Sequence, residues 1–264
     1  MKNRVVSDYH IHSKWSPDSK MSIQEALDHC LQNQIQDIAF TEHMDLGIQH
    51  KKAYHRLDDY IEEVSQAKHQ YPIMHILTGI EAGVNASNLT ATEQLLRTYP
   101  LEYIVFSLHA SKGAPFCSQK AYQKAGHEAF LRLYFEEMLY IVTHGERYHA
   151  LGHLDYILRY QPYTTEEFLS YEQQIKEILS QLILHHAALE INTKGIQSLD
   201  RPHPPMEILK WYVQLGGSLV VIGSDAHKAS QIGEYFHQAK EWIQSAGLGV
   251  YHTFKKGKWV ENPL

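Results

Sequence analysis

The sequence predicts an α/β fold in which seven strand–helix units form one closed or nearly closed barrel. Three observations lead to this prediction: short β-rich runs alternate with longer helical patterns, about seven such units fit into 264 residues, and no Pro/Gly/Ser-rich linker divides the chain. Strands that alternate with helices pair in parallel through right-handed crossovers. Because α/β barrels reach roughly 200–250 residues as one domain, we expect a single domain over residues 1–264. A doubly wound open sheet is the alternative.

The expected elements follow from residue pattern and from helix punctuation. Ser22 with Glu25, and Thr164 with Glu167, have the capping-box spacing that starts a helix. Pro205 suits a first helical turn, and Gly216 suits a helix end. The expected strands cover residues 4–9, 37–40, 73–80, 103–108, 150–152, 188–191 and 219–222. The expected helices cover residues 22–34, 57–70, 128–143, 164–185, 205–216 and 231–244, and the tail 250–260 does not repeat the unit.

Composition narrows the class of protein. The formal charge is −6 and the pI about 6.3, which does not indicate a nucleic-acid or membrane surface. The first residues lack the apolar stretch of a signal peptide, and no run approaches the roughly 18 apolar residues of a membrane span. Cys30 and Cys117 are too few for a disulfide framework. We expect a soluble, cytoplasmic protein.

Histidines and carboxylates recur where the expected strands end. They are His10, His12 and Asp18 after the first strand, His43 after the second, Glu81 after the third, His109 after the fourth, His153 after the fifth, and Asp225 and His227 after the seventh. The active face of a barrel lies at the carboxyl ends of its strands. Alternation along a strand also makes His10 and His12 point the same way, as it would Asp225 and His227. Because buried charges must be paired or metal-bound, the set predicts a metal centre.

Each residue alone has a simpler interpretation. A single His-x-His is a weak signal, Glu81 could cap a helix or form a salt bridge, and Asp18 beside Pro17 could belong to a turn. Their joint occurrence at matching positions favours metal binding. The remaining histidines fall mostly on helices or away from strand ends, and we expect them not to bind metal: His29, His50, His55, His69, His75, His127, His144, His149, His185, His186, His237 and His252.

In these segments the chain resembles the PHP (polymerase and histidinol phosphatase) family of metal-dependent phosphoesterases. The resemblance covers about residues 5–230, and it is the ordered set of motifs that makes it specific. The motifs are Asp8-Tyr-His-Ile-His-Ser with Asp18-Ser19, Thr41-Glu-His43, Gly79-Ile-Glu81, Ser107-Leu-His109, Gly152-His-Leu-Asp155 and Ser224-Asp-Ala-His227. Within the family the chain looks most like the monofunctional histidinol-phosphate phosphatases.

The resemblance implies a distorted (β/α)7 TIM-like barrel that holds three divalent metal ions, for which Zn, Mn and Fe all suit the ligands. It assigns His10, His12, Glu81 and Asp225 to one ion, Glu81, His109 and His153 to a second, and Asp18, His43 and His227 to a third. It also implies hydrolysis of L-histidinol phosphate, with Asp225, His227 and Glu81 as catalytic residues. Either Asp225 or a bound water would protonate the leaving alkoxide.

Charge supports a phosphomonoester substrate. Three divalent ions bring six positive charges and Asp18, Glu81 and Asp225 three negative ones, so a bridging hydroxide and a phosphomonoester dianion would complete neutrality. Arg159 and Arg201 lie in loops expected at the active face, where a guanidinium can hold phosphate oxygens by two hydrogen bonds. Lys194 and His203 are weaker candidates for the same role, and the acids Glu42 and Asp45 are candidates for the imidazole or amine of the substrate.

Other functions remain open at this point. The alternatives are a protein-tyrosine phosphatase or a nuclease of the same family, and a non-catalytic metal-binding protein. The acidic pI disfavours the nuclease. The expected partner is a small molecule, with neither nucleic acid nor membrane, and the oligomeric state is open.

Overall fold

The computed structural model describes residues 7–47 and 56–264, and in this part of the chain seven parallel strands form one sheet. Their order in space is their order along the chain. The strands are β1 (Ser7–Ile11), β2 (Asp37–Met44), β3 (His75–Gly83), β4 (Tyr103–Ser107), β7 (Ala150–Leu151), β8 (Ala188–Asn192) and β9 (Val220–Gly223). Sequential parallel pairing is what the repeated strand–helix unit predicts.

The two edges of this sheet meet, so that it forms a nearly closed barrel. Ile11 at the end of β1 makes a parallel bridge with Ala226, which follows β9. The His12 amide donates to the Ala226 carbonyl (2.8 Å), and the Ala226 amide donates to the His10 carbonyl (3.2 Å). These contacts confirm the barrel prediction and exclude the open sheet.

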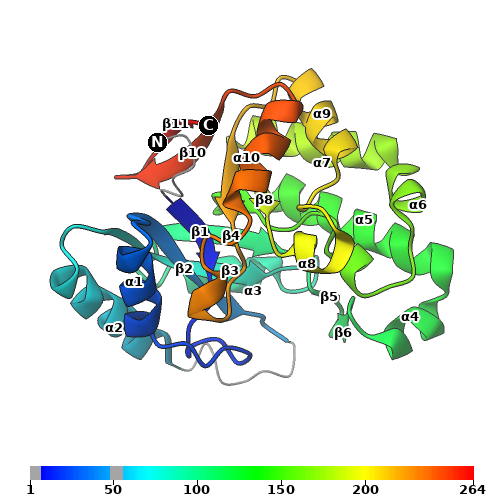
Figure 1. Ribbon diagram of the computed structural model, residues 1–264. Coiled ribbons are helices and arrows are strands. Elements are labelled where there is room, and N and C mark those ends of the chain that lie inside the picture. The colour runs from blue at the N-terminus through cyan, green and yellow to red at the C-terminus, as the bar shows by residue number, and fades with distance from the viewer. Residues whose placement is uncertain (1–6, 48–55) are drawn as a thin grey trace.

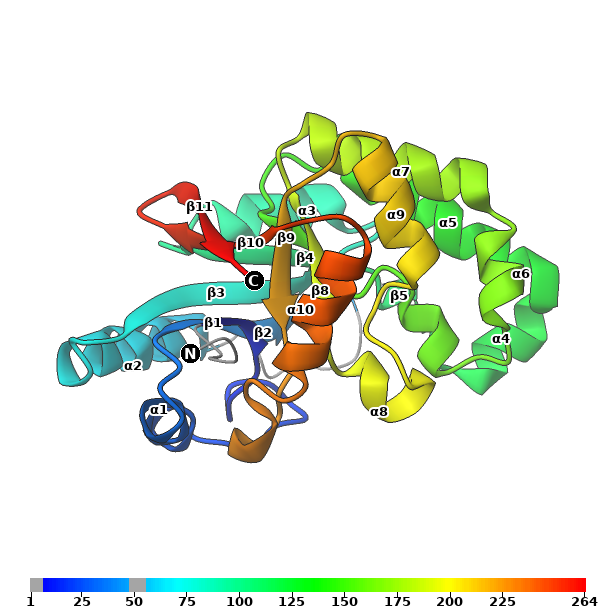
Figure 2. The same ribbon diagram turned by 45° about the horizontal axis from the view of Figure 1, so that its top comes forward.

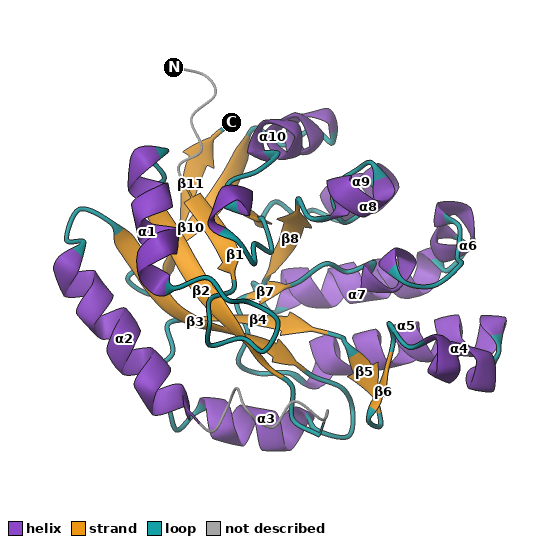
Figure 3. Cartoon of the chain, turned by 60° about the horizontal axis from the view of Figure 1, so that its bottom comes forward, coloured by secondary structure: helices purple, strands orange, loops and turns teal. Residues whose placement is uncertain are grey.

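Helices lie around the outside of the strands (Figures 1 and 3). The α-helices are α1 (Ile23–Gln32), α2 (Leu57–Gln70), α3 (Leu89–Leu96), α4 (Gln119–Ala125), α5 (His127–His144), α6 (Thr165–Leu169), α7 (Glu172–Leu184), α8 (Gly195–Leu199), α9 (Met206–Gln214) and α10 (Phe236–Ser245). In α2 the buried residues Leu57, Tyr60, Val64 and Ala67 recur at helical spacing, and this apolar stripe packs against the barrel. Among the described residues, none of the helices combines the length and the apolar character that crossing a membrane requires.

Two helix predictions need correction. The expected helix 164–185 is two helices, α6 and α7, and at the break the Ser170 hydroxyl donates to the Glu167 carbonyl (2.7 Å). The expected helix 231–244 begins only at Phe236, because Gly233 and Tyr235 have the left-handed φ values of 72° and 62°. A short 3-10 helix, η3 (Ala229–Gln231), precedes it. Both predicted capping boxes are confirmed.

The strand boundaries differ in a way that affects the site. β2 extends four residues beyond the expected end at Phe40, and β3 runs on to Gly83. His43 and Glu81 therefore lie near the ends of the regular strands β2 and β3 instead of in the loops that follow them. The expected first strand, 4–9, falls partly outside the described residues, which begin at Ser7.

The tail closes the amino-terminal end of the barrel, and, as expected, it is not another strand–helix unit. It is an antiparallel hairpin of β10 (Val250–Lys255) and β11 (Lys258–Pro263) (Figures 1 and 2). Phe254 packs with Tyr9 and Tyr103 inside the barrel, and the Phe254 amide donates to the Tyr9 hydroxyl (3.0 Å). A second small hairpin, β5 (Ala110–Ser111) with β6 (Ala114–Pro115), lies at the other end after β4.

We expect Asp37→Asn to lower the free energy of unfolding at pH 7 by about 1–3 kcal/mol, because this carboxylate receives three hydrogen bonds. Asp37 is buried, and it bonds the Tyr9 hydroxyl (3.1 Å), His75 Nδ1 (2.5 Å) and Lys255 Nζ (2.6 Å). Burial opposes ionisation, but His75 and Lys255 lower the pKa of Asp37 below its usual value.

A depressed carboxyl pKa contributes stability above the unfolded-state value of about 3.9, and this contribution is lost as the pH falls through the lower folded-state value. Urea unfolding of wild type and variant should therefore show a full difference at pH 7 and a smaller one near pH 3. A difference that stays constant with pH would contradict the assignment.

Candidate metal centre

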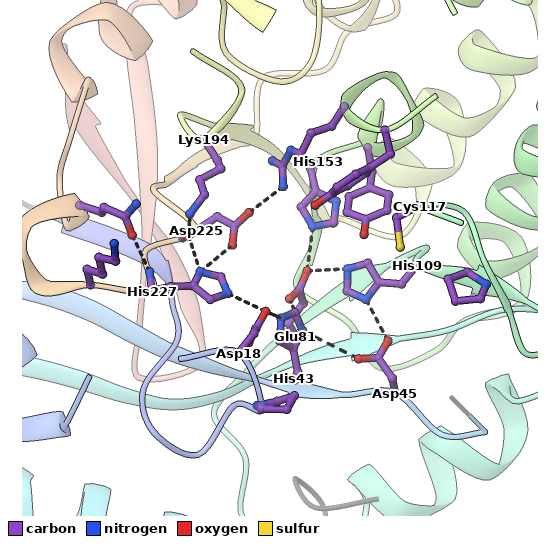
Figure 4. A pocket seen from close by; sticks show the side chains of 17 residues that line it. Asp18, His43, Asp45, Glu81, His109, Cys117, His153, Lys194, Asp225 and His227 are labelled. Atoms are coloured by element: carbon purple, nitrogen blue, oxygen red, sulfur yellow. Dashed lines mark hydrogen bonds and ion pairs between the residues drawn. The ribbon is translucent and has the colours of Figure 1, made fainter. Parts of the chain in front are cut away.

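The histidines and carboxylates meet at the carboxyl ends of the strands, on the floor of one cavity of about 620 Å³ (Figure 4). Strand and loop ends from the whole barrel contribute to it. Of the predicted ligands, the cavity lining contains Asp18, His43, Glu81, His109, His153, Asp225 and His227. His10 and His12 lie beneath them and are fully buried. None of the other described histidines lines the cavity, while His50 and His55 fall outside the described residues.

Glu81 stands at the centre of the cluster. Its side chain is buried, and five histidine ring nitrogens face its two oxygens. Facing Oε1 are His153 Nε2 at 2.8 Å and His109 Nε2 at 3.2 Å, and facing Oε2 are His43 Nδ1 at 2.9 Å, His10 Nε2 at 3.4 Å and His12 Nε2 at 3.5 Å. One carboxylate thus connects ligand atoms from the ends of four other strands, β1, β2, β4 and β7.

Asp18 and Asp225 extend the cluster on its other side. Asp18 Oδ2 lies 3.0 Å from His227 Nε2 and 3.4 Å from His43 Nε2. Asp225 Oδ1 lies 3.4 Å from His12 Nε2 and 3.6 Å from His227 Nδ1. All nine predicted ligands therefore come together.

Strand alternation does not explain how Asp225 and His227 meet. β9 ends at Gly223, and Asp225 has a left-handed φ of 52°, which an aspartate tolerates better than most residues. A local turn, held to β1 through Ala226, therefore brings the pair together. In β1 the pairing with β2 also shifts by one residue between Asp8 and Ile11, so its alternation is interrupted as well.

Carboxylates and a hydroxyl orient the histidines from behind. Glu190 Oε1 lies 2.5 Å from His10 Nδ1, Asp45 Oδ1 lies 2.9 Å from His109 Nδ1, and Ser16 Oγ lies 3.1 Å from His12 Nδ1. A carboxylate behind a histidine fixes the ring nitrogen that faces a metal. Glu190 was not among the residues predicted from the sequence, although a charged residue inside the buried strand β8 is a signal for such a role.

Several buried ligand atoms lack a hydrogen-bond partner in the protein, as expected for atoms that bind a metal ion. Among the described residues, His10 Nε2, His12 Nε2 and Glu81 Oε2 are buried and have no hydrogen-bond partner, and all three face the same space. Groups with converging ligand atoms include His10, His12 and Glu81; Glu81, His109 and His153; and His12, His43 and His227. Imidazole and carboxylate donors suit Zn, Mn and Fe.

The electrostatics of the cluster demand cations. Burial opposes ionisation of Glu81, yet His10, His109 and His43 hold the pKa of its carboxyl well below the usual value. In turn Glu81 and Asp45 raise the pKa of His109 to about 9 against the effect of burial. Burial and the neighbouring His43 lower the pKa of His12 to about 3, so this ring is neutral and has a free lone pair. Protonated histidines and metal ions neutralise such carboxylates in the same way, so metal binding releases protons.

Two of the four predicted substrate-binding residues line the cavity, namely Arg159 and Lys194. Arg159 belongs to the 3-10 helix η2 (Tyr156–Arg159), and its Nη1 lies 3.4 Å from Asp225 Oδ2. Lys194 Nζ donates to the Asp225 carbonyl (3.0 Å). Both place positive charge beside the metal cluster.

Arg201 and His203 lie behind this wall and are not part of it. Arg201 Nη1 donates to Asp155 Oδ2 (2.9 Å), and His203 Nδ1 lies 2.7 Å from Asp155 Oδ1. Asp155 is fully buried, and although burial raises its pKa, His203 and Arg201 lower the pKa to about 2. The sequence prediction that Arg201 faces the substrate is not supported by this position.

The acids near His43 differ from each other. Asp45 lines the cavity. Glu42 points away, because its buried carboxylate accepts from the Ser13 hydroxyl (2.7 Å) and the Ser16 hydroxyl (2.6 Å). Glu42 therefore holds the loop after β1, and the expectation that it contacts a substrate is wrong. A less polar wall of the cavity is formed by Pro115, Cys117, Tyr156 and Tyr160.

Comparisons with known proteins agree with this geometry. A sequence profile described as the PHP domain matches residues 8–194. The chain is 30% identical over 247 residues to a probable histidinol-phosphatase of Clostridium acetobutylicum, covering 92% of this chain and 95% of that protein. It is 28% identical over 264 residues to the histidinol-phosphatase of Lactococcus lactis, covering 97% and 96%. The crystal structure of histidinol phosphate phosphatase from Lactococcus lactis, complexed with zinc, L-histidinol and phosphate, matches with a TM-score of 0.85 and 27% identity, covering 97% and 99%.

We expect Glu81→Ala to remove at least one metal ion per chain and nearly all turnover, because this carboxylate contacts ligand atoms throughout the cluster. Wild-type protein purified without chelator should hold two to three transition-metal ions per chain, measured by elemental analysis. His69→Ala is the control, since His69 is exposed on α2 and distant from the cavity lining. Zero or one ion in folded wild type, or equal losses in the control, would show that the ligand assignment is wrong.

Proposed function

The chain belongs to the PHP domain family, and we propose that it is a metal-dependent phosphomonoesterase that hydrolyses L-histidinol phosphate to L-histidinol and phosphate. The observation that carries the proposal is the meeting, in one cavity, of a metal-type cluster with the two cations Arg159 and Lys194. Relatives that align over nearly the full length are histidinol-phosphatases, and one of them binds zinc, L-histidinol and phosphate. The cavity volume suits a small-molecule substrate.

We propose three divalent ions in this cluster. One would bind His10, His12, Glu81 and Asp225, and a second would share Glu81 and add His109 and His153. The third would bind Asp18, His43 and His227. This assignment is supported by the converging ligand atoms and by the short distances from Asp18 Oδ2 to His227 Nε2 and His43 Nε2. The zinc of the related crystal structure favours zinc over Mn or Fe.

The ions would supply a nucleophilic hydroxide at neutral pH and draw negative charge from the phosphoryl group. The chain's own residues would bind and orient the substrate. Arg159 and Lys194 would hold phosphoryl oxygens, because both present positive charge to the cavity next to Asp225. His12 and Arg159 hold the pKa of the Asp225 carboxyl well below its usual value although burial raises it. An ionised Asp225 can accept a proton from the attacking water and return it to the leaving oxygen, while Glu81 and His227 would hold the geometry.

The less polar wall would receive the imidazole of the substrate. Tyr156 and Tyr160 offer ring faces there, and Asp45 offers a carboxylate for the ammonium group on the side of His109.

We also propose that the protein works in the cytoplasm and does not bind nucleic acid. Both cysteines are free thiols, as is usual in a reducing compartment, and the net charge is negative.

A turnover assay tests the substrate. We expect kcat/KM for L-histidinol phosphate to exceed that for p-nitrophenyl phosphate and for a phosphotyrosine peptide by about 10²-fold or more, because polar groups that meet the imidazole and ammonium are left unpaired by other esters. Equal or faster turnover of the phosphotyrosine peptide would favour the tyrosine phosphatase. Cleavage of oligonucleotides would favour the nuclease, and metal-loaded protein that hydrolyses none of these esters would favour the non-catalytic alternative.

Arg159→Ala should leave metal content unchanged and lower kcat/KM by about 10²–10³-fold, the effect of losing a charged donor to a developing anion. Arg159→Lys should recover only part of the loss, because it keeps the charge without the paired donors. Arg201→Ala is the matched comparison and should cost less, since Arg201 lies outside the cavity lining and bonds Asp155. A wild-type rate for Arg159→Ala would mean that Arg159 does not hold the substrate.

A further inference from the structure

His203 is buried outside the cavity, yet both of its ring nitrogens contact charged groups. Nδ1 lies 2.7 Å from Asp155 Oδ1, and Nε2 lies 3.2 Å from Arg159 Nη2. The same guanidinium faces Asp225 with its other terminal nitrogen at 3.4 Å. His203 thus connects a buried carboxylate to the arginine that borders the metal centre.

These contacts fix the position of the imidazole proton. A guanidinium has donors and no acceptor, so His203 Nε2 must carry a lone pair toward Arg159. An ionised carboxylate only accepts, so Nδ1 must carry the proton that points to Asp155. The ring is therefore neutral in this arrangement, which agrees with the lowering of the His203 pKa by burial and by the charge of Arg159.

The surrounding backbone holds the ring in place. The His203 amide donates to the Asn192 carbonyl and the Asn192 amide donates to the His203 carbonyl, each over 2.9 Å. This bridge attaches the segment to the end of β8. Gly195 lies against the ring so closely that a Cβ there would come within 2.8 Å of His203 Cδ2. Larger residues at position 195 would displace the ring.

We propose that Asp155 and His203 form a positioning relay, which aims the Arg159 guanidinium at the phosphoryl group. Asp155 fixes the tautomer of His203, and His203 then accepts one hydrogen bond from Nη2 and leaves Nη1 directed into the cavity. The rings of Tyr156 and Tyr160, whose centres lie 5.7 Å and 5.9 Å from the Arg159 Cζ atom, add cation–π contacts to the same guanidinium. The inference rests on the proposed binding of a phosphoryl group beside Arg159.

A neutral imidazole suits this position for an electrostatic reason. A second carboxylate beside Arg159, in addition to that of Asp225, would compete further with the phosphate for the same charge. A neutral acceptor orients the guanidinium by one hydrogen bond without adding this second negative charge. Arg201 has the opposite environment, because Asp155 pairs with it directly.

Two substitutions at His203 separate the two hydrogen bonds. The amide of His203→Asn reaches the Nδ1 position and can still donate to Asp155, but it leaves Arg159 without its acceptor. The amide oxygen of His203→Gln reaches the Nε2 position and can accept from Arg159. The measurement is the Kd of inorganic phosphate for the metal-loaded enzyme, by calorimetry, with metal content checked for each variant.

We expect His203→Asn to weaken phosphate binding by about tenfold or more, in the range for a hydrogen bond to a charged group, and His203→Gln to weaken it less. In the Arg159→Ala background His203→Asn should change the Kd by less than about twofold, because the relay acts only through Arg159. Asp155→Asn lets the His203 ring turn its proton toward Arg159, and its effect on the Kd of phosphate should likewise disappear in the Arg159→Ala background. This variant replaces His203→Asn if His203→Asn does not fold. His149→Asn is the control: this half-buried histidine at the opposite end of the barrel accepts a hydrogen bond from the Ile104 amide through Nδ1.

The outcomes separate this inference from the proposed function. Equal effects of His203→Asn with and without Arg159, or a wild-type Kd for His203→Asn, would overturn the relay. Phosphate binding without turnover of histidinol phosphate would overturn the proposed substrate and leave the relay standing. Wild-type protein that holds its metals but does not bind phosphate would overturn both.

Discussion

The constraint on which the whole structure depends is the burial of the Glu81 carboxylate. A buried charge is stable only when opposite charge or a metal compensates it. Five histidines from the ends of four strands surround this carboxylate, and Glu190 and Asp45 hold two of those rings from behind. Glu81, Glu190 and Asp45 thus concentrate negative charge in one buried place, which divalent cations would compensate.

The barrel is what makes such a concentration geometrically attainable. Parallel strands point all their carboxyl ends to one face, so residues far apart in the chain meet there. Gly223 shows how tight the packing is, since a Cβ at this position would come within 2.5 Å of His10 Cβ and 2.6 Å of Glu190 Oε1. The hairpin of β10 and β11 covers the other end of the barrel, where Phe254 and Trp259 pack with the apolar interior residues.

The sequence predicted the parts of this structure that leave local signals. The bounds of α2 agree with the expected range, because its apolar residues recur at helical spacing, and the capping boxes of α1 and α6 form as expected. The ends of β2 and β3 were misplaced, because the polar residues Thr41 and Glu81, which follow the expected ends, lie inside the regular strands. The ligand set could be predicted because strand ends repeat the same residue types. The connection from Asp155 to Arg159 could not be predicted, because it depends on which buried side chains face each other across the barrel.

The two arginines show why position in the chain does not determine a role. Both follow strand ends, and both were expected to bind phosphate. Asp155 forms an ion pair with Arg201 over 2.9 Å, so the charge of Arg201 is already compensated inside the protein. Arg159 meets the neutral ring of His203 and the carboxylate of Asp225, whose own charge would be shared with a bound cation. Arg159 therefore keeps the larger share of uncompensated positive charge, and the difference arises from one buried histidine that stands between it and Asp155.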